Sequence, residues 1–460
     1  MTITHNEPRI AYSATQLEDL DRQVLVHPHQ SGAHHERCVI VRGADCTVWD
    51  AHGNEMLDAM GGGNWVAQVG HARPELVQAA TRQLSELEYF TGFDIYSNET
   101  AIRLAQRLVA LAPAGLDRVF FISGGSEGVE TAMKLARLFH HHRKQPDRTW
   151  IIARQFAYHG TTFGSGAATG FPGFNEGIGL PLPHVAKVSL PHPYRAADLY
   201  DDQDPTDFLI AELSDTIARI GAGNIAAMIG EPVMGGAGVL VPPADYWPRV
   251  RELLSSHGIL LIADEVVTGF GRTGAWFDSV ERGMAADILV TAKGLTSGYA
   301  PLGAVLMSDA IAETVAGAGA HLFHGHTYSG HPLPCAIALA NLDVLQQEGL
   351  IARAHTIGEW FKTELAPLAD LPVVGDIRIA GATVGIELVA DRGTRQPLMA
   401  GDVAIEMRRR HGVLVRDYGN NLVLAPPLVI APEQVAQAST ALHEVLSRLG
   451  ADGQLAGARE

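Results

Sequence analysis

A repeated alternation of short apolar strands with helical segments limits the fold of this 460-residue chain more than any other feature. Strands that are apolar on both faces are typical of a mainly parallel sheet with helices on each side. The sequence therefore predicts an α/β fold around such a central sheet. The expected strands are Arg118 to Ile122, Thr149 to Ala153, Ala226 to Glu231, Ile259 to Asp264, Asp287 to Thr291 and Gly303 to Met307.

The length of the chain predicts more than one hydrophobic core, because single cores stop growing at roughly 250–300 residues. The alternating pattern fills residues 71–333, which we expect to form a large α/β domain. Residues 334–460 mix helices and strands and predict a smaller α+β domain. Residues 1–70 hold a polar arm followed by two short strands, Cys38 to Val41 and Cys46 to Asp50, which we assign to the small domain.

Three polar residues stand where neighbouring strands of the predicted sheet end. Glu231 and Asp264 close their strands, and Lys293 follows two residues after the next one. Open parallel sheets bind ligands beyond the carboxyl ends of their strands. We therefore expect Glu231, Asp264 and Lys293 to belong to one site.

A lysine and an aspartate at adjoining strand ends suit pyridoxal phosphate. The lysine holds the aldehyde as a Schiff base, and the aspartate keeps the pyridine nitrogen protonated. The segment Gly294 to Gly303 is rich in glycine and small residues, which lets a planar cofactor approach the backbone. Taken singly, Lys293 could be a surface residue that caps a strand, and Asp264 could be the N-cap of the next element.

Two further segments could hold the same cofactor. In Ser123 to Gly128, the glycine turn with Gly125 and Ser126 opens a helix, whose free N–H groups favour a phosphate. Tyr158 and Val266 could cover the two faces of the ring, and His159 and Glu231 could contact the cofactor or its neighbours. Core packing for the first two and an ion pair for Glu231 are the alternatives.

Composition excludes several partners. A net charge of −17 argues against nucleic acid and against an anionic membrane surface. Three cysteines without a CxxC pair predict a reducing compartment, and we see neither a secretory signal nor an 18-residue apolar run, so we expect a cytoplasmic protein. The histidines between His321 and Pro332 fit no zinc pattern, so we expect no metal.

Two motifs carry a resemblance to a known family. Asp264 to Gly274, with Lys293 following at the family's separation, and His326 to Pro332 resemble the class III (subgroup II, ω-amino acid or amine–pyruvate type) pyridoxal phosphate aminotransferases of fold type I. The resemblance runs from about Trp65 to Leu428. It implies that Lys293 carries the cofactor as the internal aldimine and that Asp264 binds the pyridine nitrogen.

The resemblance also implies phosphate contacts and a dimer. Gly125 and Ser126 match the residues that bind phosphate, although the surrounding turn lacks the asparagines usual in the family. Thr327 matches a residue that binds the phosphate of the neighbouring subunit's cofactor. A homodimer with shared active sites is therefore expected.

The substrate pocket resembles that of amine–pyruvate transaminases. Relatives that act on ornithine have an arginine where this chain has Val423, whereas Arg416 looks like the mobile arginine of the amine–pyruvate enzymes. Trp65 matches an aromatic residue of their pocket, and Phe93 is a further candidate. An ordinary surface ion pair with Asp417 is the alternative for Arg416.

The leading hypothesis is an aminotransferase that moves an amino group from a primary amine or an ω-amino acid to a keto acid. We expect a ping-pong mechanism, with pyruvate as the acceptor. An aminomutase or a decarboxylating transaminase would use the same residues. A non-catalytic pyridoxal phosphate-binding regulator would need a DNA-binding module that the sequence does not offer, and a nicotinamide oxidoreductase would need a glycine fingerprint that is missing.

Overall fold

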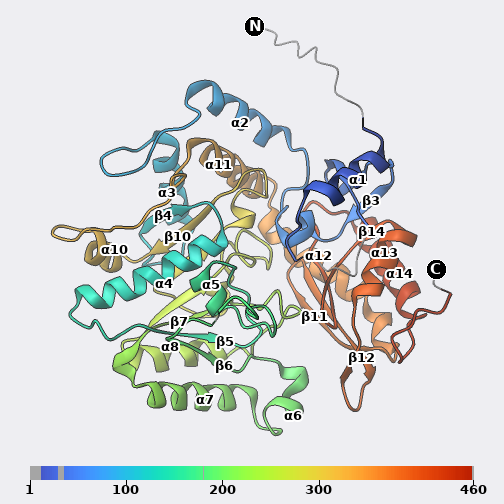
Figure 1. The fold of residues 1–460 in the computed structure, drawn as a ribbon. Helices are drawn as coiled ribbons and strands as arrows, with labels where there is room; N and C mark the ends of the chain where they lie inside the picture. The colour runs from blue at the N-terminus through green and yellow to red at the C-terminus, as the bar shows by residue number, and fades with distance from the viewer. Residues whose placement is uncertain (1–11, 30–35, 180, 458–460) are drawn as a thin grey trace.

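The computed structural model describes residues 12–29, 36–179 and 181–457 and divides into a larger and a smaller region (Figure 1). Parts of the predicted N-terminal arm, residues 1–11 and 30–35, lie outside these ranges. No helix within the described ranges is both long and apolar enough to cross a membrane.

The larger region is built on a seven-stranded sheet in the order β4-β10-β9-β8-β7-β5-β6. Neighbouring strands run parallel except at β10, which is antiparallel to both β4 and β9. The strands are β4 (Arg118–Ile122), β5 (Trp150–Arg154), β6 (Val185–Val188), β7 (Ile225–Gly230), β8 (Leu260–Asp264), β9 (Ile288–Thr291) and β10 (Gly303–Met307). A mainly parallel sheet is what the sequence predicts.

Helices cover both faces of this sheet because successive strand residues point to opposite sides. In β8, Leu260 and Ile262 pack into the core formed with α4, while Leu261 and Ala263 pack into the core formed with α8. The helix α5 packs beside α4, and α3 and α7 contact the strands β4 and β6. The helices are α3 (Glu99–Leu111), α4 (Gly125–His142), α5 (Phe163–Ala168), α7 (Pro205–Ile220) and α8 (Tyr246–Ser256).

The long helix α11 (Pro332–Gln347) packs on α2 (Pro74–Glu86) and α3 of the larger region. Its apolar residues are buried around most of its circumference, as expected for a helix enclosed by others. The predicted division of the chain into domains stays a prediction. This packing favours a boundary after α11 rather than before it.

In the smaller region, N-terminal strands share a sheet with a C-terminal one. Strands β1 (Ile40–Ala44), β2 (Thr47–Asp50) and β3 (Glu55–Asp58) form an antiparallel meander, and β14 (Val413–Leu414) adds parallel to β3. Figure 1 shows these blue strands beside the red C-terminal helices.

A second sheet of the smaller region has the order β11-β12-β16-β15. The hairpin of β15 and β16 carries Arg416 at the start of β15. Helix α14 (Pro432–Leu446) packs against α12 (Leu350–Glu364) and α13 (Gly401–His411). Helix α12 contacts β11 and β12, and α13 contacts β14 and β15. The strands are β11 (Val374–Ala380), β12 (Thr383–Asp391), β15 (Arg416–Tyr418) and β16 (Asn421–Leu424), with the short β13 (Gln396–Pro397) beside β12.

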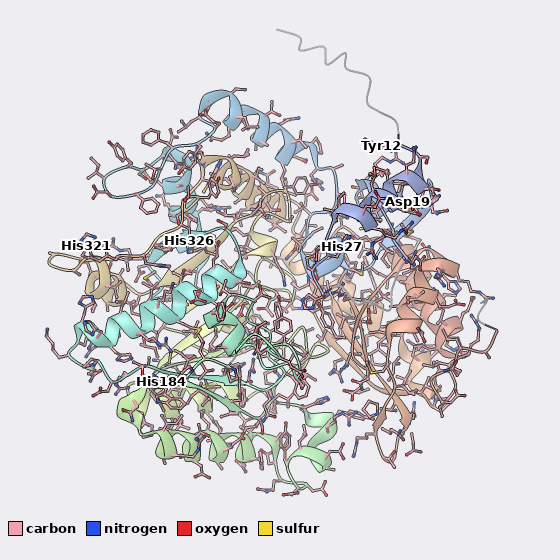
Figure 2. All side chains as sticks on the ribbon, viewed as in Figure 1. Tyr12, Asp19, His27, His184, His321 and His326 are labelled. Carbon is pink, nitrogen blue, oxygen red and sulfur yellow. The ribbon has the colours of Figure 1, made fainter. Side chains whose placement is uncertain are left out.

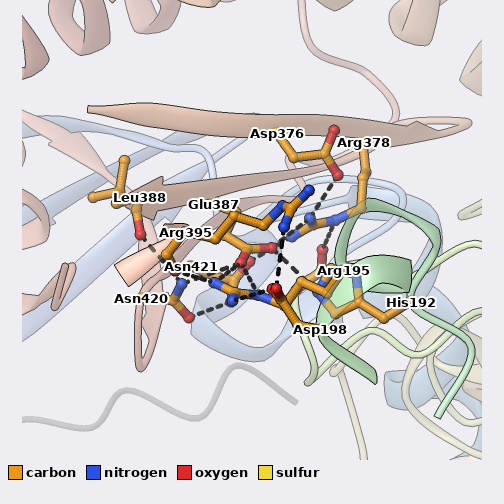
Figure 3. A network of polar contacts seen from close by, with 11 residues as sticks. His192, Arg195, Asp198, Asp376, Arg378, Glu387, Leu388, Arg395, Asn420 and Asn421 are labelled. Atoms are coloured by element: carbon orange, nitrogen blue, oxygen red, sulfur yellow. Dashed lines mark hydrogen bonds and ion pairs between the residues drawn. The ribbon is translucent and has the colours of Figure 1, made fainter. Parts of the chain in front are cut away.

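A buried carboxylate joins the two regions. Glu387 of β12 is 1% exposed, and its oxygens contact Arg195 and His192 of the larger region and Arg378 of β11 (Figure 3). Burial alone would raise the pKa of Glu387, but the surrounding cations lower it well below its usual range. The junction is therefore held by a buried network of ion pairs.

Candidate active site

The three predicted strand-end residues meet at one edge of the central sheet. Glu231 follows β7, Asp264 ends β8 and Lys293 begins the short turn after β9, and these strands are neighbours. The carboxylates of Asp264 and Glu231 lie close enough to act on the Lys293 amine electrostatically. The strand-end pattern thus brings together one amine and two carboxylates.

The amine of Lys293 is a weaker base than that of an exposed lysine. Burial lowers the pKa of its amine to about 8, although Asp264 and Glu231 oppose that shift. Its backbone adopts a positive φ of 36°, which is unfavourable for a residue with a side chain and is characteristic of functional sites. An amine with such a pKa is available in its neutral, nucleophilic form near neutral pH.

Behind Asp264 lies a chain of buried polar groups. The Asp264 carboxylate is 2.7 Å from His159 Nδ1, and His159 Nε2 is 3.9 Å from a Glu231 oxygen. Arg154, at the end of β5, donates to the same Glu231 carboxylate at 3.0 Å and is fully buried over Trp247. Asp264 is thereby fixed in orientation by His159, which suits it to hold a protonated ring nitrogen.

Gly125, the first residue of α4, lies close to Val266. A Cβ at Gly125 would lie 3.0 Å from Val266 Cγ1, so a larger residue there would require Val266 to move. Ser126 Oγ accepts a hydrogen bond of 3.2 Å from the Thr161 amide at the first turn of the 18-residue helix α4. Free N–H groups at this helix start favour a phosphate.

Aromatic side chains form one wall next to Lys293. Trp65 is 3% exposed, and its ring centre lies 5.5 Å from Lys293 Nζ and 5.5 Å from the ring of Tyr418. The guanidinium carbon of Arg416 lies 5.3 Å from the Tyr418 ring. Trp65 and Arg416 are therefore connected through Tyr418, which sequence reasoning did not select.

Tyr158 is tied to the same cluster through its backbone. Its amide donates to Glu231 at 3.2 Å, and its ring meets the edge of Phe174 at 5.8 Å. Burial raises the pKa of its hydroxyl, so the side chain stays neutral.

The single chain places Thr327 and Phe93 on its exposed surface rather than among these buried groups. Phe93 is 48% exposed and borders Gly325, and the Thr327 carbonyl accepts a hydrogen bond of 2.8 Å from Tyr89. Their assignment to an active site stays a prediction that requires a second chain.

The histidine-rich segment is folded along the larger region, as Figure 2 shows for His321 and His326. His324 bonds to Thr131 at 2.9 Å and stacks on Phe120, and His326 lies 4.0 Å from Glu127. Within the described residues, no three His, Cys, Asp or Glu side chains are grouped so as to hold a metal ion.

Residues 29–446 match the family model of the class-III aminotransferases. The chain belongs to this family. A putrescine–pyruvate aminotransferase of Pseudomonas aeruginosa is 38% identical over 420 residues, which cover 90% of this chain and 91% of the relative.

Solved structures agree with this membership. An amine transaminase from an uncultivated Pseudomonas species, in its pyridoxal phosphate-bound form, superimposes with a TM-score of 0.89 at 40% identity, covering 93% of this chain and 99% of that one. An (S)-enantioselective omega-transaminase from Thermomicrobium roseum gives 0.89 at 39% identity, covering 95% and 99%.

These findings confirm the predicted family, the type I fold, the enzyme class and the cofactor: class-III aminotransferases are pyridoxal phosphate enzymes. The residues present fit that cofactor, because an amine, a buried carboxylate and a phosphate cradle adjoin one edge of the sheet. The roles of individual residues remain predictions.

Glu265, next to Asp264, offers a test of the buried site. It accepts a hydrogen bond of 2.6 Å from the Ser279 amide, and burial raises its pKa from 4.5 to about 7. The folded protein therefore binds this proton more tightly than the unfolded one, and it loses stability as pH rises from 4.5 through about 7. A Glu265→Gln variant resembles the neutral acid and should escape this loss.

We expect the variant and the wild type to unfold at similar denaturant concentrations near pH 5. Near pH 8.5 the variant should be more stable by roughly 3 kcal/mol. A difference that does not change with pH would mean that Glu265 is not the titrating group.

Proposed function

We propose that this enzyme transfers an amino group from a primary amine or an ω-amino acid to pyruvate by a ping-pong mechanism. The observation that carries the proposal is the cation Arg416 set beside the aromatic wall of Tyr418 and Trp65, next to Lys293. The name of the 38% identical relative, a putrescine–pyruvate aminotransferase, supports the same pairing of substrates.

Besides Lys293, five residues of the same chain would contact the cofactor. Gly125 and Ser126 would receive its phosphate, Asp264 its ring nitrogen, and Val266 and Tyr158 the two ring faces. When bound, pyridoxal phosphate supplies an aldehyde that takes up amino groups and a cationic ring that accepts the electrons released at the substrate carbon.

Lys293 would carry the proton between the substrate carbon and the cofactor. Its lowered pKa leaves part of the amine neutral near pH 7, so it can accept a proton and return it. Asp264 would keep the ring nitrogen charged, and the His159 contact would keep Asp264 directed at that nitrogen. Glu231 and Arg154 would fix His159 from behind.

Arg416 would serve the acceptor. The enzyme must accept in turn a donor without a carboxylate next to its amine and a keto acid that has one. A guanidinium on a long stem can bind a carboxylate through two hydrogen bonds and then move aside for an apolar donor. Nε of Arg416 is buried without a hydrogen-bond partner among the described residues, so no described protein group uses this donor.

A homodimer is part of the proposal. Exposed aromatic and aliphatic side chains gather on the loop between α2 and α3 and on the nearby segment that carries Thr327, where Tyr89 packs against Tyr328. A second copy covering this surface would bring Thr327 to the neighbouring cofactor. The exposed residues are Phe90, Phe93, Ile95, Tyr96, Phe323 and Tyr328.

We also propose a cytoplasmic location. Cys38, Cys46 and Cys335 are all free, and the last two are buried, which suits a reducing compartment.

The proposal is tested by a panel of monoamines, diamines and ω-amino acids, each with pyruvate or 2-oxoglutarate as acceptor. We expect consumption of pyruvate in equal amount to the carbonyl product formed, without release of carbon dioxide. Carbon dioxide release would favour a decarboxylating transaminase, and turnover without an acceptor would favour an aminomutase.

Arg416→Ala should separate the two substrates. We expect the KM for pyruvate to rise by about 30-fold, since a charge-assisted contact worth roughly 2 kcal/mol is lost. The KM for a monoamine should change by no more than about twofold. Steady-state kinetics with each substrate varied in turn gives both values, and an equal rise in both would argue against the acceptor role.

A further inference from the structure

Arg378 of β11 uses its guanidinium to connect three separate segments (Figure 3). Nε donates to the Gly238 carbonyl at 2.8 Å, and Nη1 donates to Asp376 at 2.8 Å and to Glu387 at 2.9 Å. Nη2 donates to Asn421 Oδ1 at 2.5 Å. A planar fork is required to reach all of these acceptors at once.

The Asn421 contact leads to the hairpin that carries Arg416. Asn421 begins β16 and is paired with Tyr418 of β15. Arg416 lies two residues before Tyr418, at the start of β15. Asn421 also donates to Asn420 at 3.1 Å in the turn of this hairpin, and Asn420 Nδ2 donates to the Leu388 carbonyl at 3.2 Å. The turn of the hairpin is thus anchored on the Arg378 side of the sheet.

The Gly238 contact leads to a glycine loop that lies beside Trp65. Residues 235–238 form a glycine loop closed by a hydrogen bond of 3.0 Å from the Gly238 amide to the Gly235 carbonyl. A Cβ at Gly235 would lie 2.8 Å from the Trp65 ring, and one at Gly238 would overlap the Asn421 amide. The loop therefore lies between Trp65 and the hairpin. Arg378 forms hydrogen bonds with the loop, at Gly238, and with the hairpin, at Asn421.

We propose that Arg378 is a positioning residue for the acceptor pocket, which holds the Arg416 hairpin at a fixed distance from the glycine loop and Trp65. This inference rests on the proposed role of Arg416. The guanidinium of Arg378 is engaged by four protein acceptors, so we assign it no direct contact with substrate or cofactor. Its effect reaches the keto acid through the placement of the Arg416 backbone.

In this role the planar geometry of the Arg378 side chain matters more than its charge. Glu387 keeps contacts with Arg195 and His192 without Arg378, so the carboxylate is not left uncompensated when Arg378 is shortened. A lysine at position 378 would keep a cation near Glu387 but could not bond to Gly238 and Asn421 together. Arg378→Lys therefore tests the planar guanidinium separately from its positive charge.

For Arg378→Lys holoenzyme, we expect the KM for pyruvate to rise about tenfold, with kcat and the monoamine KM within about twofold of the wild type. The Kd of propanoate, an unreactive carboxylate, should rise by a similar factor in isothermal titration calorimetry. A purely structural role would instead lower stability without separating the two substrates.

The double variant Arg378→Lys/Arg416→Ala tests whether both residues act through one contact. The pyruvate KM of the double variant should equal that of Arg416→Ala alone, because the hairpin then has no guanidinium to position. Effects that multiply would overturn the inference. An Arg416→Ala enzyme with an unchanged pyruvate KM would instead remove the proposed function itself.

A second pair of variants covers the case in which Arg378→Lys does not fold. Asn421→Ala removes the acceptor at the hairpin and leaves Arg378 in place, so it should raise the pyruvate KM as Arg378→Lys does. Asn421→Asp keeps that acceptor and should restore a KM near that of the wild type. Equal KM values for all three Asn421 forms would overturn the inference.

Discussion

Lys293→Ala is expected to abolish turnover. The variant would lose both the amine that we propose joins the cofactor and the group that we propose moves the proton, and positioned proton transfer alone contributes about 10²- to 10⁴-fold. We expect kcat to fall by at least about 10⁴-fold, while the noncovalent contacts of Asp264 and the phosphate cradle still retain the cofactor. Single-turnover and steady-state assays of the purified variant measure this loss.

Lys187 supplies the matched control. It is a second lysine whose amine has a pKa lowered by burial, to about 7, and it bonds to the Ala168 carbonyl. Lys187→Met should keep its activity. After hydride reduction, mass spectrometry should find the cofactor attached to Lys293 in the wild type and in Lys187→Met. Multiple turnovers by Lys293→Ala near the wild-type rate would remove Lys293 from the mechanism.

Asp264→Asn is expected to give a folded protein of very low activity. The amide keeps the shape of the side chain and a contact with His159, but it no longer stabilises a cationic ring nitrogen. In a buried site such a charge is poorly replaced by solvent. We expect kcat/KM to fall by about 10³-fold, or roughly 4 kcal/mol of transition-state stabilisation.

Asp287→Asn is the comparison for that variant. Asp287 immediately precedes β9, the strand that Lys293 follows, and pairs with Arg251 at 2.5 Å at the opposite end of that strand from Lys293. It should retain wild-type rates. Circular dichroism establishes folding for both variants, and a pH titration of cofactor absorbance reports the ring nitrogen. Asp264→Asn with unchanged rates and an unchanged spectrum would contradict the assignment.

The central strands could be predicted closely because they are buried on both faces. The predicted strands Arg118 to Ile122 and Gly303 to Met307 coincide with β4 and β10. Burial on both faces leaves uninterrupted apolar runs, but such runs do not encode strand direction, so the antiparallel course of β10 was not foreseen. The edge strand β6 was missed, because Lys187 interrupts its short apolar pattern.

The position of residues at strand ends predicted the site better than their residue types did. Lys293, Asp264 and Glu231 were predicted to meet because parallel neighbouring strands end at one edge. Arg154 ends β5 at that same edge, so the same rule could have selected it. Tyr418 could have been found as the residue two places after Arg416, on the same face of β15.

Other residues could not be placed because their partners lie far away in the sequence or on another molecule. In the sequence, Arg378 has no feature that separates it from other strand residues. Its contacts with Gly238 and Asn421 are visible only in the folded structure. Thr327 and Phe93 are exposed in the single chain, and only a subunit interface would give them the predicted roles.

The parallel pairing of β3 with β14 sets a condition on biosynthesis. Leu57 emerges from the ribosome early, yet its partner Val413 is translated only near the end. The β3 edge of the N-terminal meander must therefore stay without its β14 partner while the central sheet assembles. Contacts this distant in sequence carry a high loop-closure cost and form late. Translation of β14, more than 100 residues after Lys293, is thus the event that completes this sheet.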